Sequence, residues 1–144
     1  MVESQGFDEA ALPALLGAAR RTYGEAIRRA LDAAGMHDLP GRGSAVVGSI
    51  ARSGSPMQQL QAEMGVSKQA VSQVVDALVD RGYLSRAVDP EDGRRLLVTL
   101  TDRGKEAAKV TRRAVAGVDR RLATKFSARD LVATRRVLGT LAAL

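Results

Sequence analysis

The fold is decided by residues 57–82, which read MQQLQAEMGVSKQAVSQVVDALVDRG. Gly65 interrupts a short helix at the start of this stretch, and Ser67 can cap a second helix that runs roughly from Lys68 to Arg81. The second helix has a valine- and leucine-rich stripe on one side and polar residues on the other. Two helices separated by a turn this short predict a helix-turn-helix.

The residues just before this stretch, Ser55-Pro56-Met57-Gln58, form a helix-start signal. Ser suits the N-cap, Pro suits the first helical position, and Gln three residues after the cap can bond back to it. After Gly82 the pattern alternates with a period of two over residues 84–88 and 96–100. The intervening Asp89-Pro90-Glu91-Asp92-Gly93 is turn chemistry, so the sequence predicts a β-hairpin, or wing.

The flanking segments are helical in pattern. Residues 12–34 carry apolar side chains at steps of three and four, with Gly35 as a C-cap, and a shorter helix is expected at about 44–52. Thr101 opens a long helix reaching about Lys125, and Ser127 with Asp130 forms a capping box for a last helix. The predicted fold class is α+β and mostly helical, a winged helix-turn-helix with N- and C-terminal helices.

Composition narrows the function classes. The chain has 144 residues, a net charge of +6 and no Cys, and His37 is its single histidine. Residues 101–144 carry a charge of +7, residues 55–100 carry −1 and residues 1–54 carry zero, so the basic excess lies in the C-terminal helices and supports a polyanionic partner only weakly. Disulfides, thiolate metal sites and thiol redox sensing are excluded. We expect no metal, no cofactor and, without a catalytic constellation, no enzyme activity.

The residues 60–67 and 71–82, the wing segment Asp89-Pro90-Glu91-Asp92-Gly93-Arg94-Arg95, and the segment 98–104 (VTLTDRG) resemble MarR-type regulators. The resemblance implies a homodimer with interleaved terminal helices, a wing arginine that enters the minor groove of duplex DNA, and small anionic or phenolic effectors. It divides the chain into an N-terminal dimerisation helix (1–36), a winged helix-turn-helix (37–104) and C-terminal dimerisation helices (105–144). The predicted function is a DNA-binding transcriptional repressor released by a small ligand.

Candidate DNA contacts follow from the chemistry of base edges and phosphates. Gln69 and Gln73 can donate and accept, which suits adenine, and Lys68 can reach guanine or a phosphate. An arginine on a hairpin tip suits a narrow minor groove, so Arg94 is the strongest single candidate, with Asp92 placed to pair with its side chain. The full set of predicted DNA-binding residues is Ser67, Lys68, Gln69, Ser72, Gln73, Arg86, Asp92, Arg94 and Arg95.

Several alternatives stay open at this level. The polar stripe could be an ordinary solvated face, and the winged helix could belong to a DNA-architectural protein without an effector or to a protein-interaction module. Tyr23 could line an effector cavity, but an aromatic at that helical spacing is more often a core or dimer contact. We expect an effector site where residues 12–34, residues 44–52 and the start of the Thr101 helix approach the predicted DNA-binding helix-turn-helix and wing. No signal or membrane-spanning run stands out, so we expect a cytoplasmic protein.

Overall fold

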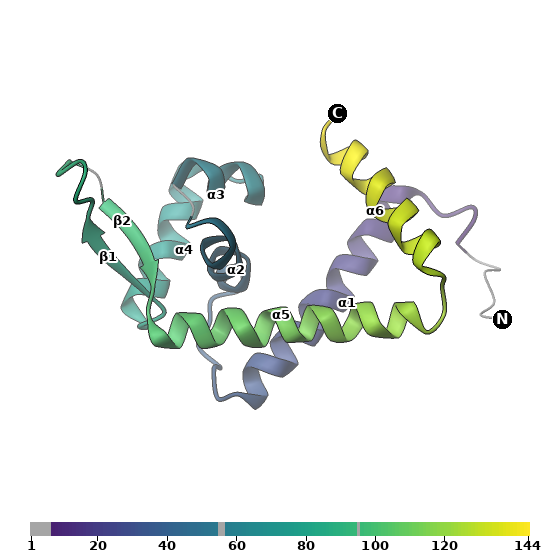
Figure 1. Ribbon diagram of the computed structural model, residues 1–144, viewed down its shortest axis with the longest axis horizontal. Coiled ribbons are helices and arrows are strands. Elements are labelled where there is room, and N and C mark those ends of the chain that lie inside the picture. The colour runs from purple at the N-terminus through teal and green to yellow at the C-terminus, as the bar shows by residue number, and fades with distance from the viewer. Residues whose placement is uncertain (1–6, 55–56, 95) are drawn as a thin grey trace. The chain divides into compact units, whose positions relative to one another are not determined.

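The computed structural model describes residues 7–54, 57–94 and 96–144. These residues form a mostly helical α+β structure with one two-stranded sheet (Figure 1). The predicted helices and strands are confirmed to within two residues at their ends. In chain order the elements are α1 (Leu12–Ala33), α2 (Gly43–Ser53), α3 (Met57–Met64), α4 (Lys68–Asp80), β1 (Leu84–Val88), β2 (Leu96–Leu100), α5 (Asp102–Ala123) and α6 (Ala128–Ala142).

The chain divides into two compact units, which are described separately. Unit 2, Ile27–Arg113, contains the last turns of α1, all of α2, α3 and α4, the hairpin and the first half of α5. Unit 1 contains the described residues before Ile27 together with Ala114–Leu144. The helix-turn-helix and the wing therefore belong to one unit.

Unit 2 holds the hydrophobic core. The predicted apolar stripe of α4 is confirmed: Val71, Val75 and Leu78 are fully buried. Their spacing of three and four residues places them on one side of the helix, so packing this side leaves the opposite side of α4 to solvent. The other buried apolar residues are Leu31, Met36, Val46, Val47, Ile50, Leu60, Tyr83, Leu84 and Ala107.

Local signals set the ends of the two central helices. Gly65 has a φ of +62°, a conformation that glycine adopts without strain, and its N–H bonds to the carbonyl of Gln61 at 3.0 Å. Ser67 then begins α4, and its hydroxyl accepts a hydrogen bond from the backbone of Ala70 at 3.2 Å. The start signal expected at Ser55 and Pro56 lies outside the described residues, although α3 follows it as expected.

The hairpin pairs β1 and β2 in antiparallel register, with Leu84 opposite Leu100 and Val88 opposite Leu96. Thr101 closes its base, because its N–H bonds to the carbonyl of Tyr83 at 3.1 Å and its hydroxyl donates to the carbonyl of Gly82 at 2.6 Å. The same hydroxyl accepts from the N–H of Gly104 at 3.1 Å and so caps α5. One threonine thus fixes the end of the hairpin to the end of α4.

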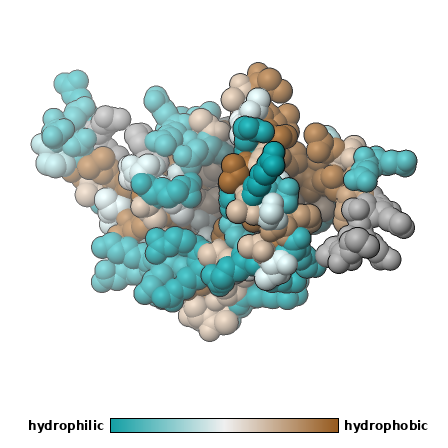
Figure 2. Space-filling view, turned by 45° about the vertical axis from the view of Figure 1, so that its right-hand side comes forward, coloured by the Kyte–Doolittle hydropathy of each residue, from teal (hydrophilic) through white to brown (hydrophobic). Residues whose placement is uncertain are grey.

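Unit 1 leaves many apolar side chains in contact with solvent. No residue of α6 is buried. The helix begins with a complete capping box, in which Ser127 and Asp130 each accept from the other's backbone. Figure 2 shows hydrophobic surface over this part of the chain. Among the described residues, no helix is long and apolar enough to span a membrane. The exposed large apolar residues of unit 1 are Phe7, Leu12, Leu16, Phe126, Val132, Val137, Leu138, Leu141 and Leu144.

Candidate nucleic-acid interface

The solvent side of α4 carries the polar residues that the sequence singled out. Lys68, Gln69 and Gln73 are exposed, and Ser72 is half-buried between them. They cluster in the first half of the helix, where unpaired N–H groups give a partial positive charge. Side chains with both donors and acceptors on an exposed helix face of this kind can bond to base edges and phosphates.

The tip of the wing is held by side chain-to-backbone hydrogen bonds. Asp89 Oδ1 accepts from the N–H of Glu91 at 2.9 Å, and Asp92 Oδ1 accepts from the N–H of Arg94 at 3.1 Å. From the sequence we expect Asp92 to pair with the side chain of Arg94, whereas in the structure its carboxylate accepts from the backbone amide of that residue. The Arg94 side chain is exposed at the tip. Arg95, the neighbouring candidate, lies outside the described residues.

A third candidate, Arg86, has a partner on α4. Its guanidinium forms a close ion pair with the carboxylate of Asp76. Arg86 lies on the same face of β1 as the buried Leu84, because alternate residues of a strand share a face, and this directs it towards α4. The pair joins two elements across a turn, and no local spacing rule predicts such a contact.

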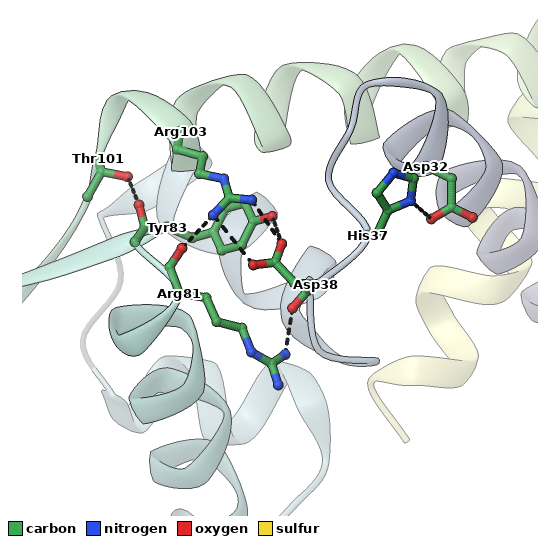
Figure 3. Close-up of polar contacts among 8 residues, drawn as sticks. Asp32, His37, Asp38, Arg81, Tyr83, Thr101 and Arg103 are labelled. Atoms are coloured by element: carbon green, nitrogen blue, oxygen red, sulfur yellow. Dashed lines mark hydrogen bonds and ion pairs between the residues drawn. The ribbon is translucent and has the colours of Figure 1, made fainter.

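A polar cluster that the sequence analysis missed surrounds Tyr83 (Figure 3). The Tyr83 ring is fully buried, and its hydroxyl donates to Asp38 Oδ1 at 2.6 Å. The guanidinium of Arg103 lies 4.3 Å above the ring, donates to Asp38 Oδ1 at 2.9 Å and donates to the carbonyl of Arg81 at 2.7 Å. This cation–π and hydrogen-bonded cluster ties the loop before α2 to the end of α4 and the start of α5.

The cluster shifts the ionisation of both its acids. The hydrogen bond from Tyr83 lowers the pKa of the Asp38 carboxyl, and Arg103 adds to the effect. Burial, together with the hydrogen bond to Asp38, raises the pKa of Tyr83 to about 12. At neutral pH the cluster is therefore a carboxylate held by a neutral phenol and a guanidinium.

A second polar contact joins α3, the helix before the turn, to α2. Ser49 is buried, and its hydroxyl donates a short hydrogen bond to the carboxylate of Glu63 on α3. The amide of Gln59 donates to the same carboxylate at 3.2 Å, and Arg52 lies 3.7 Å from it. The Ser49 hydrogen bond lowers the pKa of Glu63, so this carboxylate stays charged and fixes α3 against α2.

Unit 2 also contains an open groove of about 550 Å³. Its floor is formed by apolar residues of α2 and β2, including Ile50, Ala51 and Val98. Three cations spaced four and three residues apart on α5, Lys105, Lys109 and Arg112, stand along it. Of the three elements expected to surround an effector, α2 and the start of α5 line this groove, whereas no described residue of α1 does.

Unit 1 contains a smaller hollow of about 230 Å³ beside Tyr23. The Tyr23 hydroxyl donates to Asp119 Oδ1, which raises the pKa of Tyr23, and Arg135 lies 3.6 Å from the other oxygen of that carboxylate. Tyr23 is half-buried, and the hollow is lined chiefly by α5 and α6. Within the described part of the chain, no group of three metal-ligating side chains occurs, and His37 contacts Asp32 at 3.4 Å.

Two packed helices joined by a tight turn, followed by a hairpin on the same core, define a winged helix-turn-helix protein. Residues 37–95 match the model of the MarR family. This part of the chain is thus similar to the MarR family, and the chain has the fold of solved MarR-family proteins.

Individual relatives agree with this assignment. An HTH-type transcriptional regulator of Mycobacterium tuberculosis is 40% identical over 45 residues, which is 31% of this chain and 32% of that protein. The match thus spans about a third of the length of this curated relative.

Solved structures extend the likeness to the whole fold. A MarR-family protein of M. tuberculosis in complex with salicylic acid is 27% identical, with a TM-score of 0.63, over 93% of this chain and 98% of that one. MarR of E. coli in complex with operator DNA is 20% identical, with a TM-score of 0.72, over 90% and 92% of the two chains.

Proposed function

We propose that this chain is a transcriptional regulator that binds duplex DNA in a sequence-specific manner as a homodimer. In this proposal it is a repressor, and a small phenolic or anionic ligand releases it from DNA. The observation that carries the proposal is the exposed polar face on the first half of α4, supported on one core with a wing that has Arg94 exposed at its tip.

The side chains have separable roles in this proposal. Gln69 and Gln73 read base edges in the major groove, and Lys68 contacts guanine or a phosphate. Ser67 and Ser72 bond to phosphates beside the helix N-terminus. Arg94 enters the minor groove, where narrow A·T-rich segments concentrate negative potential, and Asp92 fixes the turn that presents it. Arg86 and Arg95 complete the predicted surface.

The homodimer accounts for the exposed apolar residues of unit 1. Large contiguous apolar surfaces are uncommon on monomers and mark interaction sites. Leu12 and Leu16 on α1 and Leu138 and Leu141 on α6 stay exposed among the described residues of the single chain. We therefore assign the segments 1–36 and 105–144 to dimerisation. Deletion of residues 127–144 should yield a monomer or an aggregate in sedimentation, and a stable dimer after this deletion would contradict the arrangement.

The groove of unit 2 supports the ligand-responsive part. Its volume lies in the range of small-molecule sites, and its apolar floor beside three cations suits an apolar body with an anionic group. Salicylic acid, the ligand of the M. tuberculosis relative, has this chemistry. A ligand can release DNA only if it binds more tightly to the conformation that binds DNA poorly.

Selection of bound fragments from genomic DNA tests the central proposal. The expected outcome is enrichment of a shared motif with two half-sites, and binding of the recovered duplex with a steep salt dependence. Equal binding to scrambled duplexes would favour an architectural protein, and failure to bind any duplex at low salt would favour a protein-interaction module.

A second experiment tests the ligand. Aromatic carboxylates should raise the melting temperature and release the recovered duplex, and Lys109→Gln should weaken both effects. Lys125→Gln is the matched control because Lys125 lies outside the groove. Compounds that stabilise the protein but leave DNA affinity unchanged would contradict ligand-released repression.

A further inference from the structure

The ion pair between Asp76 and Arg86 joins α4 to the first strand of the wing, at the edge of the face that the proposed function assigns to DNA. Asp76 follows Gln73 by three residues and Ser72 by four, so it continues the same exposed stripe of α4. A carboxylate here stands at the edge of the face that the proposed function assigns to DNA. Left alone, it would repel phosphates.

The contribution of this ion pair to folding stability is too small to explain its presence. Both side chains are exposed, 39% for Arg86 and 56% for Asp76, and exposed ion pairs contribute little to folding. Arg86 occupies Oδ1 of the carboxylate, while Oδ2 accepts no hydrogen bond from the described residues. One oxygen is thus fixed and the other is available on the surface of α4.

We propose that Asp76 is a specificity-determining residue of the DNA reader and that Arg86 is its positioning residue. Asp76 Oδ2 accepts from a base donor such as the amino group of cytosine and repels duplexes that present acceptors or phosphate at that edge. Arg86 acts through Asp76 by neutralising and orienting its carboxylate, and it is not itself a main phosphate contact. This inference rests on the proposed function, because it assumes that α4 faces DNA.

A double-mutant cycle separates this role from a direct phosphate contact. The probes are a duplex that the wild type selects from a random pool and a scrambled duplex of equal composition. Asp76→Asn should strengthen binding to the scrambled duplex, by roughly 2- to 30-fold for two subunits, and lower the preference for the selected one. Arg86→Ala should weaken binding to both duplexes in the wild type, and much less in the Asp76→Asn background.

Controls keep each outcome decisive. Asp80→Asn removes an equal charge from α4 one turn further from its N-terminal half, without touching the pair, and should leave the preference between the two duplexes unchanged. Arg86→Lys keeps the cation and should restore most of the binding lost in Arg86→Ala, even if the alanine variant folds poorly.

Two results would overturn the inference while leaving the proposed function in place. One is an Arg86→Ala defect that is equal or larger in the Asp76→Asn background, which would make Arg86 a direct DNA contact. The other is an unchanged preference in Asp76→Asn. A wild type that selects no duplex would overturn the proposed function and this inference together.

Discussion

The hydroxyl of Tyr83 lies 2.6 Å from Asp38 Oδ1, across 45 residues of sequence. This contact fixes the loop before α2 to the short segment between α4 and β1. Arg103 reaches the same carboxylate from α5, so a single acceptor holds three segments of unit 2. The end of α4 is therefore held by a buried phenol and a carboxylate that lie outside that helix.

Asp38→Asn should flatten the acid limb of the stability curve. Because the pKa of Asp38 is lowered in the folded state, its stabilisation is complete above the ordinary aspartate value of about 4 and is lost as the pH falls through the lowered value. The wild type should thus lose free energy of unfolding more steeply than Asp38→Asn below about pH 4. Urea denaturation between pH 7 and pH 3 measures this. Parallel curves for the two proteins would show that the carboxylate adds nothing.

Gly104→Ala should be strongly destabilising. A Cβ at this position would lie 2.0 Å from the backbone carbonyl oxygen of Tyr83, so the start of α5 would have to move away from the hairpin base. We expect a loss of roughly 1–3 kcal/mol in the free energy of unfolding, in the range of overpacked core substitutions.

Gly117→Ala is the matched control for this clash. It lies on the same helix, and its Cβ would meet nothing closer than 3.7 Å from a flexible arginine. It should leave stability unchanged or raise it by up to about 1 kcal/mol, because alanine favours a helix over glycine. Thermal unfolding of both variants checks the contrast, which fails if they shift the melting temperature equally.

Local sequence patterns predicted the helices and strands of this chain. They did not predict contacts between residues that are far apart in the sequence. The cap of α6 was predictable because Ser127 and Asp130 are three residues apart and bond to each other's backbone. The contact of Tyr83 with Asp38 was not, because its partners are brought together only by packing of the core. The wing turn lies between these cases. The residues that form the turn were predicted correctly, but Asp92 bonds to the backbone amide of Arg94 and not to its side chain. The DNA-binding roles of the candidate residues stay predictions.

Arg94→Ala should weaken DNA binding on cognate and scrambled duplexes alike. The side chain is exposed at the wing tip, and a cation in the minor groove supplies charge and shape readout more than base identity. The slope of log affinity against log salt concentration should become shallower by about one unit for each ionic contact with DNA that is lost, counted in each subunit. Binding isotherms at several salt concentrations measure this slope. An Arg94→Ala protein that binds like the wild type would remove the wing from the interface.

Gln73→Ala should instead change base preference. Its exposed amide on α4 can bond to one base edge in each half-site, and losing that bond costs roughly 1–3 kcal/mol on the cognate base. The salt slope should stay as in the wild type because no charge is removed. Isotherms on duplexes with each base pair substituted in turn locate the position. A uniform loss on every sequence would contradict base reading by Gln73.

Thr101 pins both ends of the hairpin, since it bonds to the backbone of Tyr83 and Gly82 at the point where β2 ends and α5 begins. Thr101 lies outside the tip of the wing, so its bonds at the hairpin base do not involve the residues of the tip. We therefore expect substitutions in the segment 89–94 to leave α4 and α5 in place, because the hairpin base is held by Thr101 and β1 by the contact of Arg86 with Asp76. The sequence of the tip and the position of the hairpin base are therefore set by different residues of this chain.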